Sequence, residues 1–262
     1  MKIAEAIENY LVASRIREET PGKERKFYVS DMGKCMRVRF LKRKGIDTEF
    51  ANFVYWTFWL GDMIHDFGYK ALEAQNLLLA TEEYLTIGKH FTGRFDGKVK
   101  GEKDVPTIFD FKSANPWKIK KLEAGGDDGE DDAMQVLTYV MAYKKDNTDI
   151  SDDGIVVYIN KEPSEKVTTT LVVTKTFHLN LWKNKIDEDM AKMIKYWEKD
   201  ILPPCTCPGW MKPYNSFQPF CQMIDKDVIK YLKLLDKDQK VISTKESVFV
   251  VAGNKKEKVI SI

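Results

Sequence analysis

The spacing of apolar residues changes its period along this chain, and that change limits the fold more than any other feature. Recurrence every three to four positions predicts helices over 3–18, after Ser30-Asp31 as far as Gly45, and over 51–79, 133–145 and 181–200. Alternation of apolar and polar residues predicts strands over 84–100, 107–113, 154–160 and 168–178. A short helix and a hairpin around Gly253-Asn254 are predicted to follow in the tail. This order predicts an α/β fold with helical additions at both ends.

Charge and composition exclude several classes of protein. The chain of 262 residues carries 42 basic and 40 acidic residues, and 43% of its residues are hydrophobic. A disordered polyelectrolyte has low hydrophobicity and a large net charge, so that class is excluded. The longest apolar stretch, 53–60, is far shorter than the ~18 residues of a membrane span. The N-terminus lacks the apolar region of a signal peptide, so we expect a cytoplasmic protein, in the host cytoplasm if the chain is viral.

The strongest local signal is Asp110-Phe111-Lys112 on a predicted strand. Side chains alternate faces along a strand, so Asp110 and Lys112 should project together while Phe111 points into the core. A carboxylate can hold a hard divalent cation, and a neighbouring ammonium can stabilise charge that develops on phosphorus. This combination suits metal-assisted cleavage of a phosphodiester. Taken alone, the tripeptide is weak evidence, because such pairs occur by chance and usually form a solvated ion pair.

Other candidate residues lie on both sides of this strand. His65 falls in the middle of the helix predicted over 51–79, and Asp96 stands between glycines in Gly93-Arg94-Phe95-Asp96-Gly97. Gln135 and Tyr139 are four residues apart and therefore share one face of a helix. Each has an ordinary structural interpretation as a core histidine, a turn or a core edge. Their occurrence together in one order is the informative feature.

That order resembles the RecB-type branch of the PD-(D/E)XK nuclease superfamily, over about Ser30 to Cys221. The resemblance implies a restriction-endonuclease-like core, with a central mixed β-sheet flanked by helices. It implies that Mg²⁺ or Mn²⁺ is bound by His65, Asp96, Asp110 and the backbone carbonyl of Phe111. It also implies that the catalytic residues are Asp96, Asp110, Lys112, Gln135 and Tyr139.

The four cysteines, Cys35, Cys205, Cys207 and Cys221, suggest one four-thiolate site. Their order, with one cysteine ahead of the core and three after Leu202-Pro203-Pro204, resembles the iron–sulfur nucleases of this superfamily. These include the AddAB nuclease domain and the four-cysteine CRISPR adaptation nucleases. The resemblance implies a structural [4Fe–4S] cluster that joins the N- and C-terminal segments. The C-x-C spacing departs from the family's usual C-x-x-C. Zn²⁺ is the alternative occupant, and buried or accidental thiols that hold no metal are the remaining alternative.

Basic and aromatic residues supply candidate contacts to DNA, although basic runs are more often solvated faces. We expect these contacts from Arg37, Arg39, Lys118, Lys120 and Trp117. The predicted organisation is an N-terminal helical segment over 1–50, a nuclease core over 51–200, a cysteine segment over 201–223 and a C-terminal helix and hairpin over 224–262.

The resemblance implies a metal-dependent exonuclease that acts on single-stranded DNA ends with 5′→3′ polarity. A helicase, a recombinase or CRISPR adaptation proteins are the implied partners, and no membrane is involved. Two alternatives stay open. One is a structure-specific or restriction-like endonuclease, and the other is a non-catalytic DNA-binding module assembled with a helicase or recombinase.

Overall fold

The computed structural model divides the chain into two compact units, each described here by itself. Unit 1 comprises Met1–Phe27, Lys34–Thr57 and Ala191–Ile262, and unit 2 comprises Tyr28–Gly33 and Phe58–Met190. The residues that the structure describes are 3–14, 25–50, 52–101, 104–126, 129–147, 149–207, 216–235, 239–252 and 255–261.

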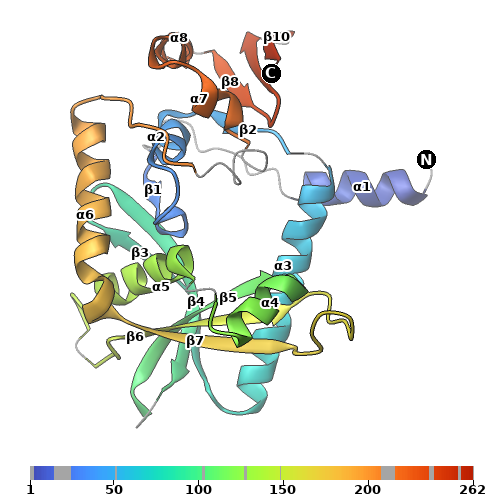
Figure 1. Cartoon of the computed structure of the whole chain (residues 1–262), viewed down its shortest axis with the longest axis vertical. Helices are drawn as coiled ribbons and strands as arrows, with labels where there is room; N and C mark the ends of the chain where they lie inside the picture. Colours follow the sequence, from blue (N-terminus) through green and yellow to red (C-terminus); the bar gives the residue numbers. More distant parts are fainter. Residues whose placement is uncertain are drawn as a thin grey trace. The chain divides into compact units, whose positions relative to one another are not determined.

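Figure 1 shows the order of the elements along the chain. The helices are α1 (Ile3–Ala13), the 3₁₀ helix η1 (Val29–Asp31), α2 (Met36–Lys44), α3 (Asn52–Ala74), α4 (Pro116–Glu123), α5 (Glu130–Tyr143), α6 (Leu179–Glu198), α7 (Gln218–Gln222) and α8 (Asp225–Leu235). The strands are β1 (Phe27–Tyr28), β2 (Asp47–Thr48), β3 (Leu78–Ile87), β4 (Phe91–Lys100), β5 (Pro106–Ala114), β6 (Asp153–Asn160), β7 (Val172–His178), β8 (Lys240–Ser243), β9 (Ser247–Ala252) and β10 (Lys255–Ser261).

Unit 2 is built on a mixed sheet. Its strand order is β1-β4-β5-β6-β7, and β3 also pairs with β4. The β5–β6 pair is parallel, and the chain between these two strands forms α4 and α5, as a parallel connection requires. The β3–β4, β4–β5 and β6–β7 pairs are antiparallel. The predicted fold class, a central mixed sheet flanked by helices, is therefore confirmed.

Helices cover both faces of this sheet. On one face α5 packs so closely on β6 that a methyl group at Gly154 would lie 2.9 Å from Val136. On the other face α3 packs against β5, where Phe109 and Phe111 form a cluster with Tyr69. Side chains of β5 that alternate in direction therefore meet α5 and α3 in turn.

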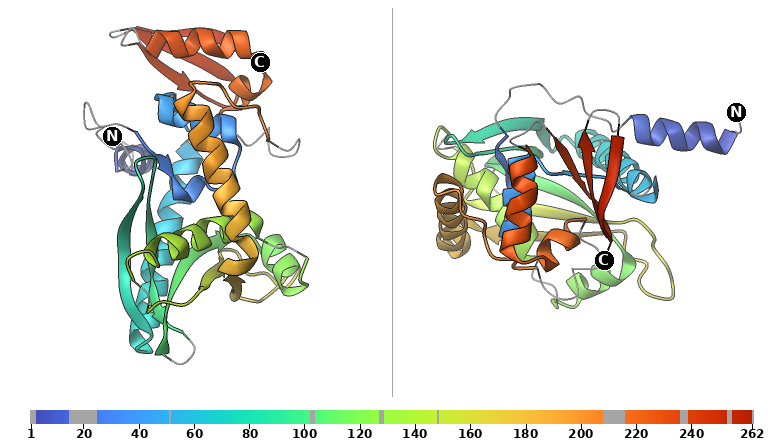
Figure 2. Two further views of the ribbon diagram at one scale, coloured as in Figure 1. Left: turned by 90° about the vertical axis from the view of Figure 1, so that its left-hand side faces the viewer. Right: turned by 90° about the horizontal axis from the view of Figure 1, so that it is seen from above.

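Unit 1 contains a second, smaller sheet with the strand order β10-β9-β8-β2. Strand β2 is parallel to β8, whereas β8–β9 and β9–β10 are antiparallel. Its core joins Leu41 of α2 and Val228 of α8 to Val241 and Val248 of the sheet. Figure 2 shows α8 lying along this sheet.

The structure corrects several predicted boundaries. Helix α2 begins at Met36 rather than directly after Asp31, because Gly33 adopts a φ of +77° that no helix accommodates. The stretch predicted as one strand over 84–100 is a hairpin, β3 and β4, that turns at Gly88. Helix α3 ends at Ala74, so residues from Leu78 onward belong to β3.

The region after the Asp110 strand contains an unexpected helix. Asn115 caps α4 by accepting a hydrogen bond from the backbone amide of Lys118, and Pro116 occupies the first turn.

In the tail, the predicted hairpin is present as β9 and β10, although the residues at its predicted centre, Gly253-Asn254, lie outside the described part.

Among the described residues, no helix combines the length and the apolar character needed to cross a membrane.

Candidate active site and thiol cluster

The side chains of Asp110 and Lys112 leave β5 on the same face, as predicted. Asp110 accepts a hydrogen bond of 2.8 Å from Gln135 Nε2, and Lys112 Nζ donates one of 3.0 Å to Gln135 Oε1. Lys112 and Asp110 also form an ion pair. Gln135, on α5, therefore holds both residues at once. Phe111 points the other way and is buried.

The Asp110 side chain is buried and that of Lys112 is 28% exposed, and this partial burial affects their charges. Burial alone would lower the pKa of Lys112, but the neighbouring Asp110 carboxylate more than offsets that effect and raises it. Lys112 therefore stays an ammonium at neutral pH. Its Nζ is fixed in direction by a carboxylate and an amide oxygen.

Asp96 is positioned by a local break in the sheet. The β4–β5 pairing runs from Lys100–Pro106 to Gly97–Phe109, one step short of Asp96. Beyond that point, the backbone amide of Phe111 donates a hydrogen bond of 2.6 Å to Asp96 Oδ2. The Asp96 carboxylate thus accepts the kind of hydrogen bond that a backbone carbonyl of the neighbouring strand accepts in a regular sheet. This bond brings the carboxylate beside Asp110 on β5.

The negative charge of Asp110 acts on its neighbour Asp96. Burial, and then the negative charge of Asp110, raise the pKa of Asp96, while the Phe111 amide opposes the shift. Asp96 and Asp110 are only 15% and 3% exposed. One ammonium thus faces two buried acids, and a divalent cation would supply the missing positive charge.

His65 lies opposite Asp96 on α3. Its Nδ1 is 3.8 Å from Asp96 Oδ1, too far for the two atoms to be joined by a hydrogen bond. Burial lowers the pKa of His65 despite the nearby carboxylates, which favours the neutral imidazole. Neutral imidazole is the form that ligates metal ions. Carboxylate oxygens are ligands that suit Mn²⁺ or Mg²⁺, and a neutral imidazole nitrogen can add a further ligand.

Gly93 and Gly97, on either side of Asp96, leave room for neighbouring side chains. A methyl group at Gly93 would lie 2.7 Å from the Tyr139 hydroxyl, and one at Gly97 would meet the Phe109 ring at 2.8 Å. Tyr139 is buried against Phe95, and burial followed by the charges of Asp110 and Asp96 raises its pKa. Tyr139 therefore keeps its phenolic proton and lines the core behind the acids.

Tyr69 is a residue of this site that sequence reasoning missed. Its hydroxyl donates a hydrogen bond of 3.0 Å to the backbone carbonyl of Asp96, and its ring packs against Phe111. It follows His65 by four residues and so shares its face of α3. The four-residue spacing from His65 was the feature of the sequence that could have identified Tyr69.

Gly68 controls the approach of α3 to β5. A methyl group at Gly68 would overlap the Phe111 ring, whereas one at Gly61 would meet nothing within 4 Å. We expect Gly68→Ala to destabilise the protein by about 1–3 kcal/mol, because overpacking displaces α3 and with it His65. Gly61→Ala is the matched control and should stabilise the protein by up to about 1 kcal/mol through helix propensity. Thermal unfolding of both variants is the measurement, and equal effects would contradict this packing.

The predicted DNA contacts fall into two groups. Arg37 and Arg39 are 5% and 2% exposed. Arg37 donates to the carbonyls of Pro203, Phe220 and Met223 and pairs with Asp225 at 2.5 Å. That burial indicates a role in packing the C-terminal segment.

The remaining predicted contacts lie on α4 of unit 2. Trp117 is 63% exposed, and Lys120 lies over its ring at 5.9 Å. Lys118 pairs with Asp132 at 3.0 Å and lies over the Tyr158 ring. Its charge is therefore partly balanced within the protein.

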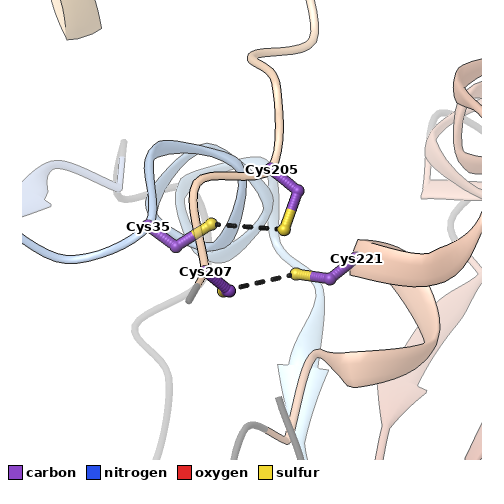
Figure 3. Close-up of side chains that lie close together, drawn as sticks. All are labelled: Cys35, Cys205, Cys207 and Cys221. Carbon is purple, nitrogen blue, oxygen red and sulfur yellow. Dashed lines mark hydrogen bonds between the residues drawn. The ribbon is translucent and has the colours of Figure 1, made fainter. Parts of the chain in front are cut away.

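The four cysteines form a second cluster, within unit 1, and Figure 3 shows their side chains converging. All four sulfur atoms lie within 4.8 Å of one another. Cys35 Sγ is 3.9 Å from Cys205 Sγ, and Cys207 Sγ is 3.7 Å from Cys221 Sγ. The backbone amide of Thr206 also donates to Cys35 Sγ at 3.4 Å.

The pKa values of the neighbouring thiols are shifted in different directions. Hydrogen bonding from Cys221 lowers the pKa of Cys35 to about 4, and the same interaction raises the pKa of Cys221. Burial raises the pKa of Cys207 to about 12. One thiolate is stabilised by the neighbouring thiols, and a metal cation that binds all four sulfur atoms can replace the protons of those thiols. The predicted convergence of all four cysteines is confirmed.

Comparison with known proteins supports the fold. No protein-family model and no curated protein matches the chain. The solved structure of SSO0001 superposes with a TM-score of 0.51 at 17% identity, covering 85% of this chain and 97% of that one. At that identity the likeness shows the fold alone.

Two solved exonucleases are more distant neighbours. The alkaline exonuclease LHK-Exo from Laribacter hongkongensis has a TM-score of 0.38 at 12% identity, covering 50% of this chain and 63% of that one. A phage-related exonuclease from Haemophilus somnus 129PT has a TM-score of 0.36 at 14% identity, covering 54% and 70%. Similarity at these TM-scores is too low to carry an argument about function.

Proposed function

We propose that this protein is a metal-dependent deoxyribonuclease whose active site is formed by His65, Asp96, Asp110, Phe111 and Lys112. One observation carries the proposal. Two acids from adjacent strands, a neutral histidine and a fixed ammonium meet in unit 2, with Gln135 bound to both Asp110 and Lys112. The resemblance to RecB-type nucleases supports the same assignment.

Each residue has a role that follows from its geometry. His65, Asp96, Asp110 and the Phe111 carbonyl would hold Mg²⁺ or Mn²⁺. Such an ion lowers the pKa of bound water and stabilises charge on a phosphate. Lys112, held by Asp110 and Gln135, presents its ammonium to the charge that develops on phosphorus. Gln135 and Tyr139 position these groups, and no side chain need form a covalent intermediate.

The finer assignment is an exonuclease that acts on single-stranded ends with 5′→3′ polarity, and it rests on the resemblance alone. The test compares linear with covalently closed circular single-stranded DNA, in Mn²⁺ and in EDTA. We expect Mn²⁺-dependent loss of linear DNA, early release of a 5′ label and survival of the circles. Cleavage of circles would indicate the endonuclease instead, and binding without cleavage would indicate a non-catalytic module.

We also propose a structural metal centre on the four thiolates of unit 1. Thiolates at ~2.3 Å from a tetrahedral Zn²⁺ lie ~3.8 Å apart. The Cys35–Cys205 and Cys207–Cys221 sulfur pairs, at 3.9 and 3.7 Å, are close to that distance. A [4Fe–4S] cluster takes the same four ligands but is larger, so the sulfurs would have to move apart. The resemblance favours the cluster, and the sulfur spacing favours zinc. Iron and zinc analysis of the purified protein, with its visible absorbance, decides between them.

A further inference from the structure

The exposed face of the β3–β4 hairpin continues the candidate active site along the sheet. Tyr84 pairs with Arg94 across the two strands. The same register, between Thr81–Gly97 and Glu83–Phe95, places Glu82 opposite Asp96. Residues directly opposite in a sheet lie on the same face. Glu82, Tyr84 and Arg94 therefore stand beside Asp96, and they are called the hairpin face below.

The hairpin face combines an exposed aromatic ring with an exposed cation. Tyr84 is 76% exposed, and the guanidinium of Arg94 lies 5.6 Å from the centre of its ring. The side chain of Arg94 is 42% exposed. A lone exposed aromatic needs no explanation, but this ring is paired with an arginine two residues from a carboxylate of the proposed metal centre.

Glu82 fixes the direction of Arg94. It forms an ion pair of 3.0 Å with Arg94 Nη1. Its φ is +50°, a left-handed conformation that is rare for a glutamate within a strand and costs on the order of 1 kcal/mol. The backbone is therefore held in an unfavourable conformation at the residue whose carboxylate pairs with Arg94 and adds negative charge near Asp96.

We propose that the hairpin face is a nucleotide subsite, in which Tyr84 stacks on an unpaired base and Arg94 binds the phosphate attached to it. This inference rests on the proposed function and names its substrate, a single-stranded end next to the phosphodiester to be cut. Arg94 and Asp96 are two strand residues apart, a rise of ~7 Å. A planar guanidinium binds phosphate oxygens in pairs, and base–aromatic stacking tolerates every sequence.

The experiment measures binding of a single-stranded oligonucleotide that carries 2-aminopurine near its 5′ end. It uses the full-length protein with Lys112→Gln, so that the DNA stays intact in Mn²⁺. We expect Tyr84→Ala to weaken binding about tenfold or more and to abolish the change in 2-aminopurine fluorescence. Tyr84→Phe, which keeps the ring, should preserve both. Val172→Ala, at an exposed residue of β7, is the control and should change neither.

A second probe separates the two contacts. An abasic oligonucleotide offers phosphates but no bases, so Arg94→Gln should weaken its binding while Tyr84→Ala should not. Unchanged binding and fluorescence in Tyr84→Ala, with normal cleavage by the otherwise unaltered protein, would reject the subsite and keep the nuclease. Tyr84-dependent stacking in a protein that cleaves nothing would reject the nuclease and keep the subsite.

Discussion

Asp110→Asn and Lys112→Gln should each reduce Mn²⁺-dependent cleavage of single-stranded DNA by at least ~100-fold. Asp110→Asn removes a negative charge that the proposed metal centre needs. Lys112→Gln removes the ammonium that faces the phosphate and leaves Gln135 without its cationic partner. Initial rates with an end-labelled linear oligonucleotide are the measurement.

The matched control is another aspartate–lysine pair of unit 2. Lys183 and Asp187 form an exposed ion pair on α6, with side chains 56% and 48% exposed. Asp187→Asn and Lys183→Gln should leave the rate unchanged and the stability within about 1 kcal/mol. Asp110→Asn should still fold, because the substitution relieves the repulsion between Asp110 and Asp96. Full activity in a folded Asp110→Asn or Lys112→Gln protein would refute the mechanism.

Replacing any one cysteine of the cluster by serine should cost the protein its structural metal. Cys35 and Cys205 are 170 residues apart in the sequence, so a shared ion closes a long loop and restricts the unfolded chain. Loss of a metal centre is one of the few single changes that destabilise by more than ~4 kcal/mol. We expect Cys205→Ser to lower the melting temperature by ~10 °C or more.

The control for this substitution lies between two of the ligands. Thr206 is flanked by Cys205 and Cys207, and its hydroxyl accepts a long hydrogen bond of 3.4 Å from the Met36 amide. Thr206→Val should therefore retain the metal and nearly all of the stability. Metal content and thermal unfolding are measured on both variants. A Cys205→Ser protein with full metal content and an unchanged melting temperature would show that the thiols hold no ion.

Local patterns predicted part of the geometry around Asp110. Strand alternation predicted that Asp110 and Lys112 share one face of β5, as the structure shows, and helical spacing predicted that Gln135 and Tyr139 share one face of a helix; the contact of Gln135 with Asp110 and Lys112 is known only from the structure. Both inferences depend only on the period of a single element.

Features that depend on register or on distant partners were not predictable. Tyr84 and Arg94 meet because the hairpin turns at Gly88, and a turn one residue away would have put them on opposite faces. Arg37 resembled a surface contact because its partners, from Pro203 to Asp225, lie more than 160 residues away. Helix α4 was missed because its cap, Asn115, follows a strand without a break.

Manganese binding tests the central claim most directly, because carboxylates suit Mn²⁺ whereas thiolates select softer metals. The measurement is an EPR titration of the protein and of His65→Ala, Asp96→Asn and Asp110→Asn with Mn²⁺. We expect one saturable Mn²⁺ site with a coupling between the ion and a nitrogen nucleus that disappears in His65→Ala. Both aspartate variants should bind Mn²⁺ clearly more weakly. Manganese binding that is unchanged by all three substitutions would contradict the claim.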